Sequence, residues 1–158
     1  MRSGAIYKPT PQTNGSTPHS SAELFWGHIK KWDVSEVTDM SGLFKDGIHG
    51  RAKKNTQKFN EDLSRWDVGK VKKMGKMFDG CEAFASDLSG WDVKNVEDMG
   101  GMFYNADNFN SEIGEWNVSK VTNMVSMFDG AGSFAADISE WNVRQVSDMR
   151  FIFQGAAR

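Results

Sequence analysis

Apolar residues recur along the chain at fixed distances from five tryptophans. The tryptophans lie 34, 25, 25 and 25 residues apart, and repeats of this length are typical of solenoids and other arrays. A Val follows each Trp by two and by five residues, a Met by eight and a Phe by twelve. Another Phe precedes each Trp by seven residues, and an Ile or Leu by three. The repeat begins at Phe25, and its anchors are Trp32, Trp66, Trp91, Trp116 and Trp141.

A single unit of this length is not expected to fold alone. Burying about seven apolar side chains contributes roughly 10–20 kcal/mol, whereas ordering about 25 residues costs nearly twice that. Units that stack cover one another's apolar faces. We therefore expect one solenoid domain over residues 23–158, with equivalent side chains in columns along its axis. The expected core includes Trp66, Trp91, Trp116, Trp141, Phe78, Phe103 and Phe128.

Each unit contains two local patterns. The segment D-[LI]-S-x-W-[DN]-V is rich in β-branched and aromatic residues, which favour an extended or turning backbone. The segment M-x-x-[LMI]-F-x-x-[GCA] has the i, i+3, i+4 spacing of a short helix or 3₁₀ turn. These patterns predict an α/β repeat fold of about five coils, each with one strand-like and one helix-like part. Cys81, at the end of the second pattern, is expected to be a core thiol.

Two segments stand outside the repeat. Residues 1–22 are rich in Pro, Ser, Thr, Gly and Asn, which predicts a flexible or extended arm. In this arm Ala5, Ile6 and Tyr7 are candidates for contact with a neighbouring molecule. An insertion of nine residues falls within about 45–58. No apolar run of seven occurs in the arm, so we expect no signal peptide and no segment that spans a bilayer.

Charge separates along the chain, although the formal net charge is only −2. Residues 51–76 carry nine Lys or Arg against three acidic residues, and residues 77–158 carry thirteen acidic residues against five basic ones. The basic segment is either a contact for an acidic partner or a solvated insertion beside ordinary surface. The candidate contacts are Arg51, Lys53, Lys54, Lys58, Lys70, Lys72, Lys73 and Lys76.

No set of residues indicates catalysis or a cofactor. The three histidines occupy non-equivalent places, no phosphate-binding glycine motif occurs, and a single Cys excludes an intramolecular disulfide or a cysteine-rich zinc site. Asp or Asn follows each of the five repeat tryptophans, and such columns either bind Ca²⁺ or, as we expect, cap repeated turns. We therefore expect no enzyme activity, cofactor or metal. Asn14 and Asn117 match the glycosylation triplet.

The strings Asp137–Val143 and Val121–Met124, the latter followed by Met127 and Phe128, resemble the BspA-type repeat of microbial surface proteins. That repeat is also known as a repeat of unknown function in mycoplasma lipoproteins. The resemblance covers about 130 of the 158 residues. It implies a leucine-rich-repeat-like solenoid on an exported or surface-attached protein, with adhesion or partner binding as its role and no catalytic residues.

The sequence thus predicts a non-enzymatic surface or scaffold module that binds protein or glycan partners. The fifth unit reaches Arg158 without an evident polar cap, and solenoids normally cover their last coil. Head-to-tail assembly of copies into a filament is therefore a specific form of this function. The alternative is an intracellular structural subunit of a larger complex, in which the 51–76 region holds an acidic partner, with nucleic acid the less expected one.

Overall fold

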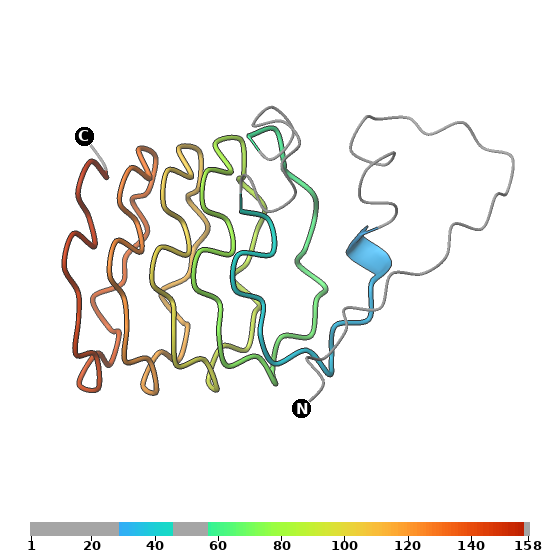
Figure 1. The fold of residues 1–158 in the computed structure, drawn as a ribbon, viewed down its shortest axis with the longest axis horizontal. Helices are drawn as coiled ribbons and strands as arrows, with labels where there is room; N and C mark the ends of the chain where they lie inside the picture. Colours follow the sequence, from blue (N-terminus) through green and yellow to red (C-terminus); the bar gives the residue numbers. More distant parts are fainter. Residues whose placement is uncertain (1–28, 46–56, 157–158) are drawn as a thin grey trace, which may run out of the picture.

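The computed structural model describes residues 29–45 and 57–156, which form a row of similar coils stacked side by side (Figure 1). We define coil 1 as residues 29–45 and coils 2 to 5 as residues 57–81, 82–106, 107–131 and 132–156. Chain order runs along the stack, so coil 5, drawn in red, lies at one end. The predicted arm, with Ala5, Ile6 and Tyr7, and residues 46–56 of the predicted insertion lie outside the described residues.

The described coils consist of turns, and the predicted α/β class is wrong. Their only helix is the 3₁₀ helix η1, Ile29–Lys31. Their only β pairing is a series of isolated parallel bridges between successive coils. These bridges join Asp39 to Lys73, Lys73 to Asp98, Asp98 to Asn123 and Asn123 to Asp148. Neither a strand near each Trp nor a helix after each Met is present in this part of the chain.

Left-handed residues explain why the predicted helix is absent. In coil 3 the φ angles of Gly101 and Asn105 are +63° and +52°, outside the right-handed region that a helix requires. Amides bond three residues back only at alternate positions, as from Met102 to Met99 and from Tyr104 to Gly101. A chain of turns therefore produces the apolar spacing that suggested a helix.

The intervening amides connect neighbouring coils. Four amide nitrogens of coil 3 lie 2.8–3.0 Å from carbonyl oxygens of coil 4, and coils 2 and 4 donate in the same way to the coil that follows each. In each of these peptide groups the carbonyl accepts from the preceding coil, so the N–H points toward the coil 5 end of the stack. The four donors of coil 3 are the amides of Met99, Gly101, Phe103 and Asn105.

Aromatic rings fill the interior of the stack. The ring centroid of Phe103 lies 3.7 Å from that of Phe109 and 5.6 and 5.7 Å from those of Phe78 and Phe128. In coils 2 to 5 each indole Nε1 donates to a carbonyl of the preceding coil. All the expected core residues are buried, and so is Cys81: Trp66, Trp91, Trp116, Trp141, Phe78, Phe103 and Phe128.

Ser111 is the one buried polar side chain among the described residues. Its hydroxyl accepts a hydrogen bond from the amide of Leu88 at 2.9 Å and donates one to Asp87 at 3.1 Å. Ala136 has the equivalent position in coil 5, and there the buried amide of Ile113 has no acceptor among the described residues. The interface between coils 3 and 4 therefore has a hydrogen bond that the interface between coils 4 and 5 lacks.

We predict opposite effects from exchanging these two residues. Ser111→Ala should lower the free energy of unfolding by about 1–3 kcal/mol because it leaves a buried amide unsatisfied, and Ala136→Ser should raise it by about 1 kcal/mol. Urea denaturation measures both changes, with Ser133→Ala, at an exposed serine, as the control. A similar loss in Ser111→Ala and Ser133→Ala would contradict the assignment.

Candidate binding surface

Coil 5 exposes apolar side chains at positions that are buried in the other coils. Met149 and Phe153 are 40% and 47% exposed, whereas Met124 and Phe128, at the same positions of coil 4, are 0% exposed. Phe151 lies between them and is 59% exposed. Coil 5, which carries these side chains, lies at one end of the stack and is followed by no other described coil (Figure 1).

An apolar hollow of about 240 Å³ lies at this end, beside Phe134, Ile138 and Phe153. Within the stack, the ring of Phe134 lies 3.9 Å from that of Phe128 in the preceding coil. The described residues supply no equivalent ring against Phe153. The hollow is therefore at the place where a following coil would insert its first Phe.

The backbone of coil 5 presents a row of hydrogen-bond donors on the same side. The amides of Met149, Phe151, Phe153 and Gly155 are equivalent to the four that donate from coils 2, 3 and 4 to the next coil, and within the described residues they have no acceptor. We call the surface formed by these four residues with Phe134 and Ile138 the open face. Its partner must offer carbonyl oxygens at every second residue.

Phe151 has a backbone conformation that is unusual for a bulky residue. Its φ is +61°, and a side chain in the left-handed region costs about 1–3 kcal/mol. Gly42 and Gly101 stand at the same position in coils 1 and 3 and adopt the same conformation. An aromatic side chain is thus held on the open face where a glycine would be less strained.

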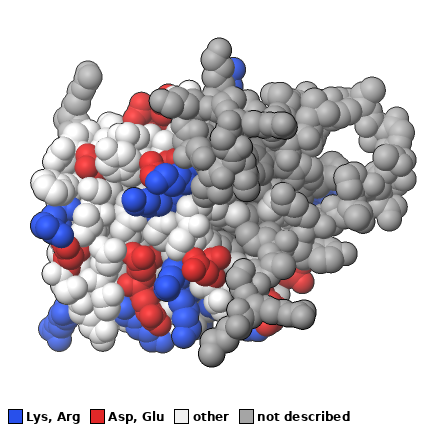
Figure 2. Space-filling view, viewed as in Figure 1, with Lys and Arg blue, Asp and Glu red and all other residues white. Residues whose placement is uncertain are grey.

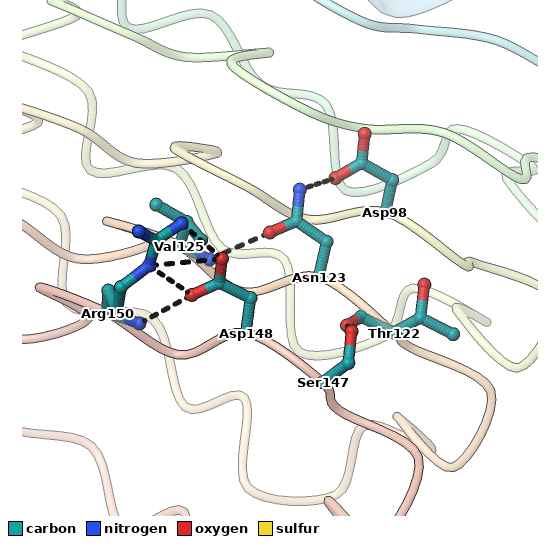
Figure 3. A network of polar contacts seen from close by, with 7 residues as sticks. All are labelled: Asp98, Thr122, Asn123, Val125, Ser147, Asp148 and Arg150. Atoms are coloured by element: carbon teal, nitrogen blue, oxygen red, sulfur yellow. Dashed lines mark hydrogen bonds and ion pairs between the residues drawn. The ribbon is translucent and has the colours of Figure 1, made fainter.

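A ladder of Asp and Asn side chains follows the bridges through coils 3 to 5, at Asp98, Asn123 and Asp148 (Figure 3). Asn123 donates from Nδ2 to Oδ1 of Asp98 at 2.8 Å, and its own Oδ1 accepts from the amide of Val125 at 3.0 Å. Asp148 accepts from the amide of Arg150 at 3.1 Å and pairs with its guanidinium at 2.6 Å. The Asp148–Arg150 pair is the charged end of the ladder.

The remaining Asp and Asn columns cap backbone turns. Oδ1 of Asp62 accepts from the amide of Ser64 at 3.1 Å, and Oδ1 of Asn117 accepts from the amide of Ser119 at 3.2 Å. Within 29–45 and 57–156 no three His, Cys, Asp or Glu side chains form a group that could hold a metal ion. Turn capping therefore accounts for these columns. Asn117 uses its side chain in a cap, and Asn14 lies outside the described residues.

Hydrogen bonds from serines lower the pKa of several aspartates. The hydroxyl of Ser64, followed by its amide, lowers the pKa of Asp62 below the usual 3.8. The amide of Ser89, followed by its hydroxyl, lowers the pKa of Asp87. Hydrogen bonds from the residue two positions later also lower the pKa of Asp33, Asp39, Asp92, Asp137 and Asp148.

These lowered pKa values predict sensitivity to acid. The folded chain binds protons less readily than the unfolded chain, so the free energy of unfolding should be greatest above the unfolded pKa and fall as the pH drops from about 5 to about 2. Each exposed aspartate contributes little, and the fall is the sum of small terms. Urea denaturation across this range should show a smaller fall for Asp62→Asn with Asp87→Asn, which keep the acceptor oxygens. An unchanged fall would contradict this cause.

A groove of about 510 Å³ runs beside the ladder, lined in part by Gly75, Gly100 and Tyr104. A Cβ on Gly100 would lie 2.6 Å from Nδ2 of Asn123, so a larger residue there would displace the Asn123 side chain. Asp98 and Asn123 also line the groove, but they already bond to each other and to the backbone. Lys76 and Tyr104 also line the groove, and their side-chain polar atoms have no hydrogen bond or ion pair among the described residues.

The described members of the predicted basic cluster all lie in coil 2, and two of them are close to acidic side chains. Lys70 pairs with Glu36, and Lys72 lies 3.9 Å from Glu97. Basic and acidic side chains are mixed on the face shown in Figure 2. Arg51, Lys53 and Lys54 lie outside the described residues, and Lys58, Lys73 and Lys76 are exposed without an ion pair among the described residues.

The open face was only partly foreseen. The unfinished fifth unit indicated an open end, but Met149, Phe151 and Phe153 were not singled out as surface residues. The repeat contains the missing signal, because an apolar position that each coil buries against the next must be exposed in the last coil. The sequence pattern does not indicate the four backbone N–H donors of the open face.

Within the described residues there is no helix with the length and apolarity needed to cross a membrane. Neither the curated proteins nor the solved structures gave a match to the chain. The model of a family described as “Mycoplasma protein of unknown function, DUF285” matches residues 13–105 and residues 85–158. These two overlapping matches together include the whole repeat region. The chain therefore belongs to this family of mycoplasma proteins of unknown function.

Proposed function

We propose that the chain is a non-enzymatic scaffold module that binds a protein partner through its open face. The observation that supports this most is the combination, on one surface, of exposed Met149, Phe151 and Phe153 with a row of amides that have no acceptor among the described residues. A polypeptide supplies carbonyl oxygens at every second residue, and the addition of such a chain to an open edge is a common mode of recognition.

A glycan is the less favoured partner. The groove is the candidate site for a glycan, and two of its polar side chains, Asp98 and Asn123, are already bonded to each other. The open face offers apolar side chains and a regular row of N–H groups. We therefore assign the binding role to the open face and a polypeptide partner.

We also propose that the module is of the BspA type and acts at the cell surface or outside the cell, in adhesion or the binding of other proteins. The strings Asp137–Val143 and Val121–Met124 and the match to a mycoplasma repeat family support this assignment. Head-to-tail assembly of copies is one form of the same function.

Site-specific photo-crosslinking tests the proposed role of the open face. Benzoylphenylalanine is introduced in place of Phe153 and, as a control, in place of Glu115, which is exposed in coil 4. Each protein is irradiated both in purified form and on intact cells. We expect polypeptide adducts from position 153 at a yield at least tenfold above that from position 115. Equal yields, or no polypeptide adduct from position 153, would contradict the proposal.

A further inference from the structure

We infer that the polypeptide partner is a second copy of this chain, whose coil 1 docks on the open face of coil 5 as if it were the next coil. The inference rests on the proposed function, because it names the partner of the same surface. It is carried by hydrogen-bonding groups that lack partners at the two ends of the stack and match one another in number, type and register.

The first match is between backbone groups. At the corresponding positions, four carbonyls in each of coils 3 to 5 and three in coil 2 accept amides of the preceding coil, whereas in coil 1 four such carbonyls have no donor among the described residues. Continuing the register across a joint pairs each free amide of coil 5 with one of them. The pairs are Met149 with Asp39, Phe151 with Ser41, Phe153 with Leu43 and Gly155 with Lys45.

The second match involves a tryptophan. The indole N–H of Trp32 has no acceptor among the described residues, although Trp32 is only 8% exposed, and buried indoles usually find one. In coil 4 the carbonyl of Ile113 accepts both the amide of Trp116 and the indole of Trp141. The equivalent carbonyl of Ile138 in coil 5 accepts only the amide of Trp141. Across the joint, Trp32 of one copy reaches Ile138 of the other.

The polarity of the open face rules out its pairing with itself. Carbonyls that alternate with the free amides, such as that of Met149, accept from turns within coil 5. Two open faces placed together would therefore set donors against donors, and buried donors without acceptors are strongly disfavoured. The pairing must join unlike ends, and head-to-tail contacts that do not close into a ring produce filaments.

Side-chain charge agrees with this arrangement. A Cβ on Gly75 would lie 3.1 Å from Oδ2 of Asp98. The side chain at the ladder position of one coil therefore lies beside a particular residue of the preceding coil, the one that follows that coil's ladder position by two. Arg150 has that place in coil 5, so it lies beside Asp39 of the docked copy. Its guanidinium then stands between Asp39 and Asp148, and the opposite charges select this register.

The rings continue as well. Consecutive members of the Phe44 to Phe153 column lie 5.5–5.8 Å apart within the chain, and docking places Phe44 of one copy on Phe153 of the other. Phe44 is already 1% exposed in a single copy, so docking adds little to the burial of this ring. Only part of the burial is therefore gained, and assembly should depend on protein concentration.

Two variants that each block one end test the inference on the full chain. Asp39→Lys sets a cation against Arg150 at the docked end, and coil 2 already carries Lys73 at that ladder position. Phe153→Asp removes the exposed ring of the open face. Light scattering in low-salt buffer should show wild-type masses beyond twice the 17.7 kDa of one chain as concentration rises. Each variant alone should associate at least tenfold more weakly.

The mixture of the two variants gives the decisive result. Each variant retains the end that the other lacks, so an equimolar mixture should form dimers of one copy each and no longer assemblies. Glu115→Lys, the same charge change at an exposed site of coil 4, should assemble like the wild type. Matching circular dichroism spectra and urea midpoints show that the variants are folded.

Several outcomes would overturn the inference. These are a wild type that stays monomeric at every concentration, a Phe153→Asp variant that assembles like the wild type, and an Asp39→Lys variant that still dimerises alone, which would indicate contact between like ends. If adducts from position 153 contain other proteins and never a second copy, this inference fails while the proposed function stands. If position 153 gives no polypeptide adduct, the proposed function itself fails.

Discussion

Phe103→Ala is expected to lower the free energy of unfolding by about 3–5 kcal/mol. Phe103 is 0% exposed, and its ring contacts lie on both sides, in coils 2 and 4. The ring centroids of Phe78, Phe109 and Phe128 are 5.6, 3.7 and 5.7 Å away. Removing the ring therefore opens a cavity in the middle of the stack that two neighbours share. This loss is a large part of the roughly 5–15 kcal/mol that stabilises a typical domain.

Phe153→Ala is the matched control for this prediction. It makes the same chemical change at the same position of the repeat, but Phe153 is 47% exposed and its one ring partner among the described residues is Phe128, at 5.8 Å. We expect a loss of about 1 kcal/mol or less. Urea denaturation at a concentration where the chain is monomeric measures both variants. Equal losses would contradict a core shared between stacked coils.

The core could be predicted from the sequence because every unit repeats it. Trp91, Phe103 and Val96 are buried, as are their counterparts in coil 4. The same residue type recurs at each of these positions in all five units, so the sequence identifies the whole column as core. Stacking follows from the energy deficit of a single unit. The periodicity of the sequence therefore predicts which side chains form the core.

The path of the backbone could not be predicted in the same way. Lys76, Ser126 and Phe151 have φ of +58°, +52° and +61°, and nothing in these residue types indicates a left-handed conformation. Gly42 and Gly101 mark the same position in two other coils, which was the available signal. Because a turn and a helix can repeat apolar residues at similar spacing, the pattern alone favoured the wrong element.

The open face shows the same division. Its exposed apolar residues could be predicted from the repeat, because Met149 and Phe153 occupy core positions in a coil that no other described coil follows. Its row of donors depends on the direction of peptide groups, which the turns set. Sequence reasoning therefore indicated an open end, and only the backbone geometry shows which chemical groups a partner must offer.

Trp116→Ala is expected to lower the free energy of unfolding by about 3–5 kcal/mol, and Trp116→Phe by about 1–2 kcal/mol. The indole of Trp116 is stacked 6.5 Å from that of Trp91, and its Nε1 donates to the carbonyl of Leu88 at 3.0 Å. Alanine removes both the ring and the hydrogen bond, whereas phenylalanine keeps a ring. The difference between the two variants, measured by urea denaturation, separates packing from hydrogen bonding.

Trp32→Phe completes this series, because the indole N–H of Trp32 has no acceptor among the described residues. In the monomer, Trp32→Phe should therefore destabilise less than Trp116→Phe, by about 1 kcal/mol or less. If Trp32 of one copy bonds to Ile138 of the next, the same substitution should weaken head-to-tail association by about tenfold. A small change in monomer stability together with a large change in association would place the Trp32 hydrogen bond at the joint between copies. A Trp32→Phe variant that unfolds as easily as Trp116→Phe and assembles like the wild type would place it inside the monomer.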